Sequence, residues 1–100
     1  MARYSLSPEA REDLREIRDY LVIQGGSRLA RYVLHEFTAA FRLLASHPDA
    51  GHFRKDLTPL PVKFWPVFSY LVVYDPEARP VAIVRVLHGR QDVEAILGRG

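Results

Sequence analysis

The residues best suited to chemistry lie near the C-terminus, in the stretch VRVLHGRQDVEAIL (84–97). His88 can transfer a proton near neutral pH, and the guanidinium groups of Arg85 and Arg90 can hold a phosphate or a carboxylate. Lys63 adds a third cation on a separate apolar stretch. These side chains could form a catalytic set, contact an anionic partner, or play structural roles at a strand end. The elements that position them decide between these alternatives.

The chain has 100 residues, and this length predicts a single domain over residues 1–100. Its formal net charge of +2 is compatible with nucleic-acid or acidic protein partners but argues for neither. The absence of cysteine excludes disulfides, thiolate nucleophiles and thiol-based zinc sites. The four histidines show no HxH or HExxH spacing, so no metal site and no cofactor are expected. No signal peptide or membrane-spanning run is found, which predicts a cytoplasmic protein.

The N-terminal half has the pattern of a strand followed by two helices. Residues 2–6 form a short strand candidate, and Ser7 and Pro8 then supply the capping chemistry of a helix over 8–22. The glycines of QGGS (24–27) end this helix, and a second amphipathic helix continues to Pro48. Two amphipathic helices joined by a short glycine turn predict an antiparallel helical hairpin.

The C-terminal half has the pattern of a sheet. A loop of about fifteen residues, rich in proline, precedes the apolar stretches. Three strands are expected over residues 62–65, 68–74 and 81–88, and they are separated by Pro66 and by the turn DPEARP. A short helix is expected over residues 91–97. The predicted fold class is α+β: an N-terminal strand and a helical hairpin packed on a mainly antiparallel three- to four-stranded sheet, with a short C-terminal helix.

Each candidate residue also has a structural interpretation. His88 is expected to end its strand and hydrogen-bond a turn, with Gly89 supplying an unusual backbone angle. Strand alternation places Arg85 on the face of Ile83 and Leu87 unless a bulge intervenes. A charge on a covered face must be paired, so we expect a carboxylate partner, chosen from Asp13, Glu36, Asp92 and Glu94.

Two further basic sites have a simpler interpretation. Lys63 is expected to lie on an edge strand and to block the addition of further strands. Arg54 and Lys55, in the long loop, are expected to be solvated.

Three stretches resemble the RelE/ParE superfamily of type II toxin–antitoxin toxins, and more closely its ParE branch, often described as plasmid stabilisation proteins. They are YSLSPEAREDLREIRDYL, LLASHPDAGHFRKDL and YLVVYDPEARPVAIVRVLHGRQDVEAIL, in this order along nearly the whole chain. The resemblance implies one scaffold with two possible mechanisms. RelE-like members cleave messenger RNA on the ribosome, whereas ParE-like members poison DNA gyrase.

Two positions separate these mechanisms. RelE-like members place an arginine at the start of the third strand, where this chain has Leu71, and a tyrosine after the strand-end histidine, where this chain has Gly89. Tyr70 is one place from Leu71 and faces the other way. If the chain were a metal-independent endoribonuclease, its candidates would be Lys63, Arg85, His88 and Arg90. The pattern favours a gyrase poison; an endoribonuclease and a non-toxic, antitoxin-binding co-repressor remain alternatives.

The resemblance also implies two interaction surfaces. The C-terminal segment HGRQDVEAILGRG is the implied target-binding segment, with Arg90 and Arg99 as basic contacts and Val93, Ile96 and Leu97 as its docking face. A ParD-like antitoxin is the second implied partner, and operator DNA would be reached only through it. Candidate antitoxin contacts are Trp65, Tyr70 and Arg54, whereas Phe64 and Phe68 are expected to be core residues.

Overall fold

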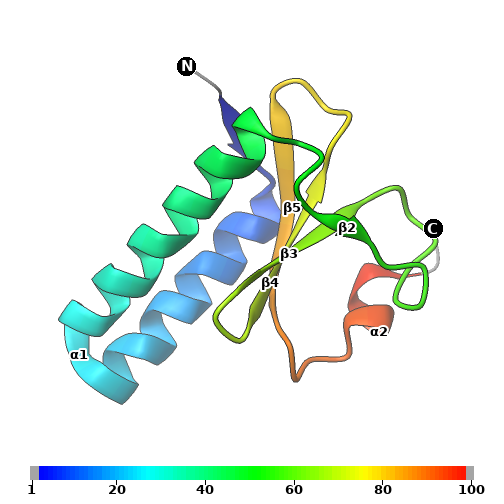
Figure 1. Cartoon of the computed structure of the whole chain (residues 1–100). Coiled ribbons are helices and arrows are strands. Elements are labelled where there is room, and N and C mark those ends of the chain that lie inside the picture. Colours follow the sequence, from blue (N-terminus) through cyan, green and yellow to red (C-terminus); the bar gives the residue numbers. More distant parts are fainter. Residues whose placement is uncertain (1–2, 99–100) are drawn as a thin grey trace.

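The structure, a computed structural model, describes residues 3–98 and consists of a helical hairpin on one face of a twisted sheet (Figure 1). A short second helix lies on the opposite face of the sheet. The elements, in chain order, are β1 (Tyr4–Leu6), α1 (Pro8–Ser46), β2 (His52–Phe53), β3 (Lys63–Val67), β4 (Tyr70–Asp75), β5 (Val81–His88) and α2 (Val93–Leu97). The predicted fold class is therefore confirmed.

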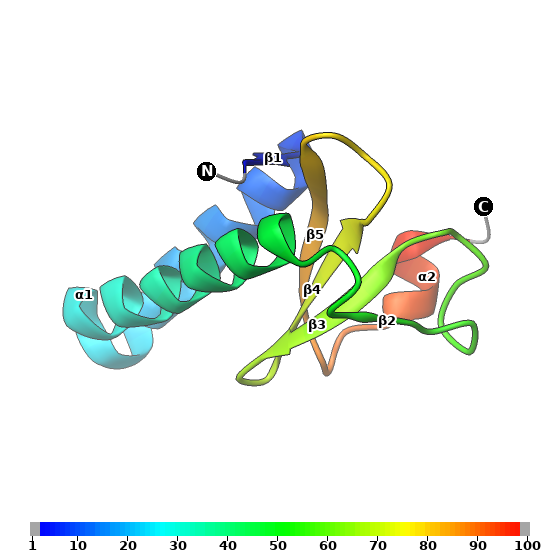
Figure 2. The same cartoon turned by 45° about the horizontal axis from the view of Figure 1, so that its top comes forward.

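The hairpin of α1 is made by one residue. Gly26 has φ 84° and ψ 177°, a backbone conformation that is essentially restricted to glycine, and it interrupts an otherwise helical run. We call residues 8–25 the first arm and residues 27–46 the second arm. Ser7 caps the first arm, because its hydroxyl accepts a hydrogen bond from the backbone N–H of Ala10 at 2.9 Å. The tip of the hairpin extends beyond the sheet (Figure 2).

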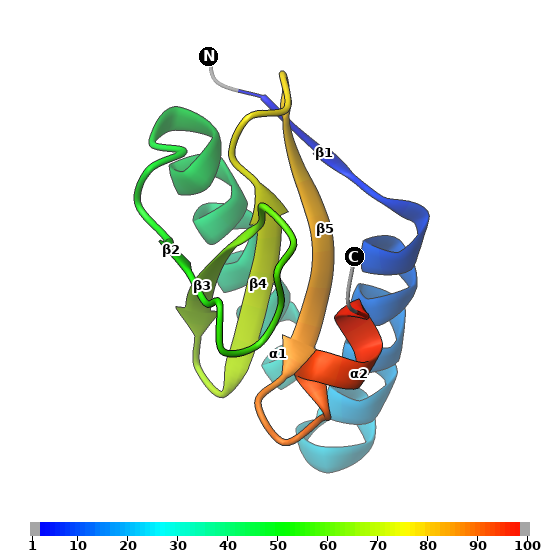
Figure 3. The same cartoon turned by 90° about the vertical axis from the view of Figure 1, so that its right-hand side faces the viewer.

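The sheet has five strands in the order β1-β5-β4-β3-β2 (Figure 3). β1 pairs with β5 in parallel, and the other three pairs are antiparallel. The number of strands is one higher than the upper end of the expected range, because β2 forms within the segment expected to be a loop. β3 also runs through Pro66 instead of ending before it. The two-residue β2 covers only Lys63 and Phe64, so Pro66 occupies an open part of the edge, where a missing N–H costs no ladder hydrogen bond.

Each face of the sheet has its own apolar core. The core under the hairpin includes Phe37, Phe41 and Leu44 of the second arm together with Val72 and Ile83 of the sheet. The core on the other face is built under α2 and the segment before β3, and its buried residues are Val62, Phe64, Val73, Leu87 and Val93. The expectation that Phe64 is a core residue is confirmed, since it is 3% exposed.

A bulge in β5 changes which side chains share a face. Val73 is paired with Arg85 and Tyr74 with Ile83, so Val84 is an extra residue between them. Ile83 consequently lies in the core under the hairpin, whereas Leu87 lies in the core under α2. The simple alternation that placed both residues on one face is wrong for this reason. Arg85 lies immediately after the extra residue.

A buried tyrosine fixes the chain between α1 and β2. The hydroxyl of Tyr74 donates a hydrogen bond to the carbonyl of Pro48 at 2.7 Å and accepts one from the N–H of Gly51 at 2.8 Å. A Cβ atom at Gly51 would lie 2.7 Å from the carbonyl oxygen of Phe64, so only glycine fits there. Across residues 3–98, no helix is both long and apolar enough to span a membrane.

Candidate functional site

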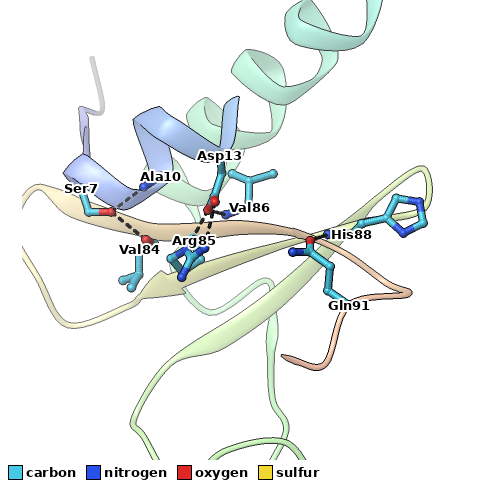
Figure 4. A network of polar contacts seen from close by, with 8 residues as sticks. All are labelled: Ser7, Ala10, Asp13, Val84, Arg85, Val86, His88 and Gln91. Carbon is cyan, nitrogen blue, oxygen red and sulfur yellow. Dashed lines mark hydrogen bonds and ion pairs between the residues drawn. The ribbon is translucent and has the colours of Figure 1, made fainter. Parts of the chain in front are cut away.

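Arg85 is held by a carboxylate of the first arm. Its Nε lies 2.8 Å from Oδ2 of Asp13 and its Nη2 lies 2.9 Å from Oδ1, a two-point ion pair between residues 72 positions apart (Figure 4). The side chains of Arg85 and Asp13 are 24% and 10% exposed. The hydrogen bonds that Arg85 donates to the Asp13 carboxylate raise the pKa of Arg85, so its charge is permanent. The expected structural ion pair is confirmed, and its partner is Asp13.

The same carboxylate closes the outer edge of β5. β1 covers this edge only as far as Ile83, so the next residues have no strand beside them. Oδ2 of Asp13 accepts a hydrogen bond from the N–H of Val86 at 2.9 Å, and the hydroxyl of Ser7 donates one to the carbonyl of Val84 at 2.6 Å (Figure 4). Polar groups of Ser7 and of Asp13 on the first arm therefore replace a neighbouring strand along this part of the edge.

His88 ends β5 and is bound within a turn. Its Nδ1 accepts a hydrogen bond from the backbone N–H of Arg90 at 3.1 Å, and its Nε2 lies 3.3 Å from the hydroxyl of Ser69. The side chain of Gln91 accepts from the backbone N–H of His88 at 2.6 Å, and Gly89 donates to the carbonyl of Ser69 at 2.9 Å. Both ring nitrogens thus have partners within the chain, which agrees with the structural role expected for this histidine. Gly89 is not among the described residues with a positive φ, so the unusual backbone angle expected there is wrong.

Two of the candidate catalytic residues, His88 and Arg90, line the same groove. It has a volume of about 410 Å³ and lies between the first arm and the segment that joins β5 to α2. Tyr70 lies in it beside His88, with ring centroids 5.1 Å apart in an edge-on arrangement, and burial raises the pKa of its phenol. The groove is lined by Asp13, Glu16, Ile17, Tyr20, Tyr70, Val86, His88, Arg90 and Gln91.

Lys63 does not belong to this groove. It is paired in register with Tyr74, whereas His88 is paired with Tyr70, four residues away along β4. At the rise of a strand, this separates the two positions by about 13 Å along the sheet. The Nζ of Lys63 lies 3.8 Å from the Asp49 carboxylate and 5.0 Å from the ring centre of Phe53 on β2. β2 covers β3 at Lys63, so the expectation that it blocks an open edge is wrong.

Of the described residues predicted to bind a target, the apolar ones pack against the sheet and the basic one is exposed. Val93 is 6% exposed and lies in the core under α2, and Ile96 and Leu97 pack against the same core. Arg90, in contrast, is exposed at the start of the segment. Arg99 lies outside the described residues. The apolar side chains of α2 thus hold the segment on the sheet and leave Arg90 as its exposed cation.

The three residues predicted to contact an antitoxin lie in different places. Tyr70 is 8% exposed and packs edge-on against Phe37 in the core. Arg54 is exposed, as expected, and binds Asp56 through two hydrogen bonds of 3.0 and 2.8 Å, which lower the pKa of that carboxyl. Trp65 is partly buried and lines a groove of about 300 Å³ between the second arm and β3.

Phe68 is the residue whose role the sequence pattern missed. It is 58% exposed, so the expectation that it is a core residue is wrong. It occupies the turn between β3 and β4 with φ 55°, a conformation unusual for a non-glycine residue, and its ring lies 6.0 Å from that of Tyr32 on the second arm. The turn forces the side chain outward, beside Trp65 in the groove. Ser69, the next residue, contacts His88 and Gly89 in the structure. No pattern in the sequence predicted these contacts.

The groove that contains Trp65 and Phe68 is mostly apolar. The second arm contributes Ala39, Ala40 and Leu43, of which Leu43 is 41% exposed, and Glu36 is its one carboxylate. β3 contributes Pro66 and Val67 to the opposite wall. Among the described residues, no group of three or more histidines and carboxylates is arranged to hold a metal ion.

Comparison with known proteins identifies the family. The family model described as the ParE toxin of the type II toxin-antitoxin system, parDE, matches residues 4–93. The chain belongs to the ParE toxin family. This ParE-type chain is therefore the toxin component of a type II toxin–antitoxin system, as the resemblance of its three stretches implied. The comparison with curated protein sequences found no match.

The fold of this ParE-family toxin is also found in a solved structure. The structure described as the chromosomal ParDE TA system from P. aeruginosa superimposes with a TM-score of 0.74 at 18% sequence identity. The match covers 88% of this chain and 96% of the other. At this identity the similarity establishes the shared fold, and individual side chains must be argued from this chain.

Proposed function

We propose that this ParE-family toxin poisons DNA gyrase by binding it, without catalysing a reaction of its own. The observation that supports this most strongly is the engagement of two of the four candidate catalytic groups within the chain. Both ring nitrogens of His88 have hydrogen-bond partners, and Arg85 is neutralised by Asp13. Lys63 lies far from His88 along the sheet, because it pairs with Tyr74 and His88 pairs with Tyr70. RNA cleavage without a metal needs a base, an acid and free cations at one phosphate.

The C-terminal segment is the proposed contact to gyrase. Val93, Ile96 and Leu97 fix this segment by packing on the sheet, and Arg90 is exposed next to the groove of about 410 Å³. A preorganised segment loses little conformational entropy on binding, which favours a tight complex. In this proposal Arg90 and Arg99 are the basic contacts, and the three apolar residues position them.

The proposed neutralising partner is a ParD-like antitoxin, which would also provide recognition of operator DNA. Its docking site is proposed to be the groove between the second arm and β3, because Trp65, Phe68 and Leu43 expose apolar surface there to a partner. Tyr70 contributes little to such a contact, since it is 8% exposed. Arg54 remains a candidate at the rim of the molecule. The proposed location of toxin, antitoxin and gyrase is the cytoplasm.

The target is tested with purified gyrase and plasmid DNA. The protein is expected to inhibit supercoiling or to accumulate cleaved plasmid, and Arg90→Glu is expected to weaken this effect at least tenfold. Arg18→Glu, which changes the same charge on the exposed side of the first arm, is the matched control and should leave the effect unchanged.

A ribosome assay tests the alternative activity. Cleavage of messenger RNA on ribosomes that disappears in His88→Ala, together with an unaffected gyrase, would establish an endoribonuclease and overturn the proposal. The third possibility is a chain without toxicity that only binds its antitoxin and contributes to repression. Normal growth when the toxin is expressed without its antitoxin would establish that function.

The antitoxin site is tested by calorimetry with the antitoxin encoded beside this chain. Trp65→Ala and Phe68→Ala are each expected to weaken binding by more than tenfold, about 1.4 kcal/mol or more. Arg18→Ala, on the exposed side of the first arm, is the comparison outside the groove. An equal loss for Arg18→Ala, or no loss for Trp65→Ala, would place the antitoxin elsewhere.

A further inference from the structure

The outer face of the second arm carries a line of basic side chains, three arginines and one histidine. Arg28, Arg31, His35 and Arg42 follow each other at spacings of three, four and seven residues, which places them on one face of the helix. All four residues are exposed. At the rise of an α-helix the line is about 21 Å long. We call these four residues the basic stripe.

The cations of the basic stripe are not neutralised by the protein itself. Among residues 3–98, no ion pair involves any of the four, whereas on the first arm Arg15 is paired with Glu12 and Arg18 with Asp19. The first arm thus has the mixed charges of an ordinary solvated surface. The second arm has one carboxylate, Glu36, and it lines the apolar groove that borders the stripe.

The shape of this face suits a smooth polyanion. Between His35 and Arg42, the face carries Thr38 and Ala39, which are too small to keep a partner at a distance. Thr38 also directs its hydroxyl back to the carbonyl of Leu34 at 3.2 Å, away from a partner. The exposed Tyr32 lies beside the stripe, but its ring packs near that of Phe68 at 6.0 Å, and the four residues of the stripe themselves offer no aromatic or large aliphatic anchor of the kind that protein partners use. A ligand with regularly spaced negative charges, such as a nucleic-acid backbone, matches it better than an acidic protein segment.

We propose that the basic stripe binds the phosphate backbone of duplex DNA without reading its sequence. Duplex DNA carries one phosphate per 3.4 Å of each strand, so about six phosphates of one strand lie along the length of the stripe. This contact is direct, whereas recognition of operator DNA was expected only through the antitoxin. It does not depend on gyrase being the target, and it would add to the binding of any complex in which the toxin lies beside DNA.

Fluorescence anisotropy with a labelled 20-base-pair duplex and the full-length protein tests this proposal. Three arginine–phosphate contacts predict a slope of about −2.7 in a plot of log affinity against log salt concentration, or roughly a 40-fold loss between 50 and 200 mM salt. The triple variant Arg28→Ala, Arg31→Ala, Arg42→Ala is expected to lose this binding. The triple variant Arg11→Ala, Arg15→Ala, Arg18→Ala removes equal charge from the first arm and should retain it.

A specific contact at the basic stripe can be distinguished from a general effect of charge. Circular dichroism should show that both triple variants are folded, because all six arginines are exposed. Equal loss of binding in both variants would show that net charge alone is responsible, and full binding by the second-arm variant would place the site elsewhere. Polyglutamate that competes as well as unlabelled duplex would indicate an acidic protein partner. Each of these three results overturns the proposal.

Discussion

Arg85 and Asp13 show how one pair of residues can serve the sheet and the helix together. The carboxylate of Asp13 accepts two hydrogen bonds from Arg85 and a third from the backbone of Val86. The cation therefore has its partner, and the N–H at the uncovered edge of β5 has its acceptor. At the scale of single residues, one of the candidate catalytic cations is therefore part of the scaffold.

Removal of this carboxylate should be costly. Asp13→Ala leaves a mostly buried guanidinium and a backbone N–H without their acceptors, so we expect the free energy of unfolding to fall by about 2–3 kcal/mol. Asp19→Ala makes the same change in the same helix at an exposed ion pair and should cost less than about 0.5 kcal/mol. Urea denaturation of both variants measures the difference. Equal losses would show that Asp13 contributes only a surface charge.

Tyr74 gives the protein a predictable dependence on alkaline pH. Burial and the nearby Asp49 raise the pKa of its phenol, although the Gly51 N–H acts in the opposite direction. The folded protein therefore holds this proton more tightly than the unfolded chain, whose tyrosine pKa is about 10. The corresponding stability is present below that pH and is lost as pH rises through the folded pKa. Tyr74→Phe should be less stable at neutral pH but lose stability less steeply above pH 10.

The exposed Tyr32 is the control for this measurement. Tyr32→Phe should retain the pH dependence of the unaltered protein, because this residue is 56% exposed. Thermal unfolding across an alkaline pH series compares the two variants. A Tyr74→Phe variant with an unchanged slope would assign the alkaline loss of stability to other groups.

At the scale of elements, the hairpin depends on the backbone of Gly26. Both arms are amphipathic, and each places its apolar residues in the core under the hairpin. The reversal between them is concentrated at one residue with φ 84°, and a Cβ atom there would meet nothing within 4 Å. A substitution at this position therefore tests backbone conformation alone, with no contribution from side-chain clashes.

The two mirror-image alanines should have opposite effects at this position. Gly26→Ala is expected to lose about 1–3 kcal/mol of stability, because an L-residue is strained at this φ and ψ. D-alanine, introduced by chemical synthesis, favours the mirror-image backbone and should match or slightly exceed glycine, since it also restricts the unfolded chain. Melting temperatures of the two synthetic proteins make the comparison. A tolerated L-alanine would mean that the hairpin can turn in another way.

At the scale of the whole molecule, the sheet is a shared wall between two cores. The hairpin covers one face, and α2 with the segment before β3 covers the other (Figure 3). Five residues of α2 cannot form a stable isolated helix, so packing must hold them in place. This arrangement connects the stability of the core under α2 to the position of the proposed gyrase-binding segment.

A truncation in α2 tests that connection. Val93→Ala removes buried methyl groups beside Phe64 and Leu87 and should cost about 2 kcal/mol. Glu94→Ala, at the exposed neighbouring position, should change stability by less than about 0.5 kcal/mol. Hydrogen exchange of the α2 amides should also accelerate in Val93→Ala. Indistinguishable variants would show that α2 does not depend on this contact.

Local patterns in the sequence were sufficient to predict most helices and strands and part of the candidate site. Capping residues, helical spacing and glycines predicted the hairpin, and apolar alternation located four of the five strands near their observed bounds. An unpaired charge among apolar strand residues would be costly, and this argument correctly predicted an acidic partner for Arg85. Each of these inferences depends on residues close together in the chain, where propensity and periodicity act.

The tertiary structure decided what depends on residues far apart. It selected Asp13 from four possible partners, added β2 to the edge, and inserted the bulge at Val84 that moved Leu87 to the other face. It also turned Phe68 outward beside Trp65. A strand alternates with a period of two, so one extra residue inverts every side chain after it. Only long-range pairing determines where that residue lies.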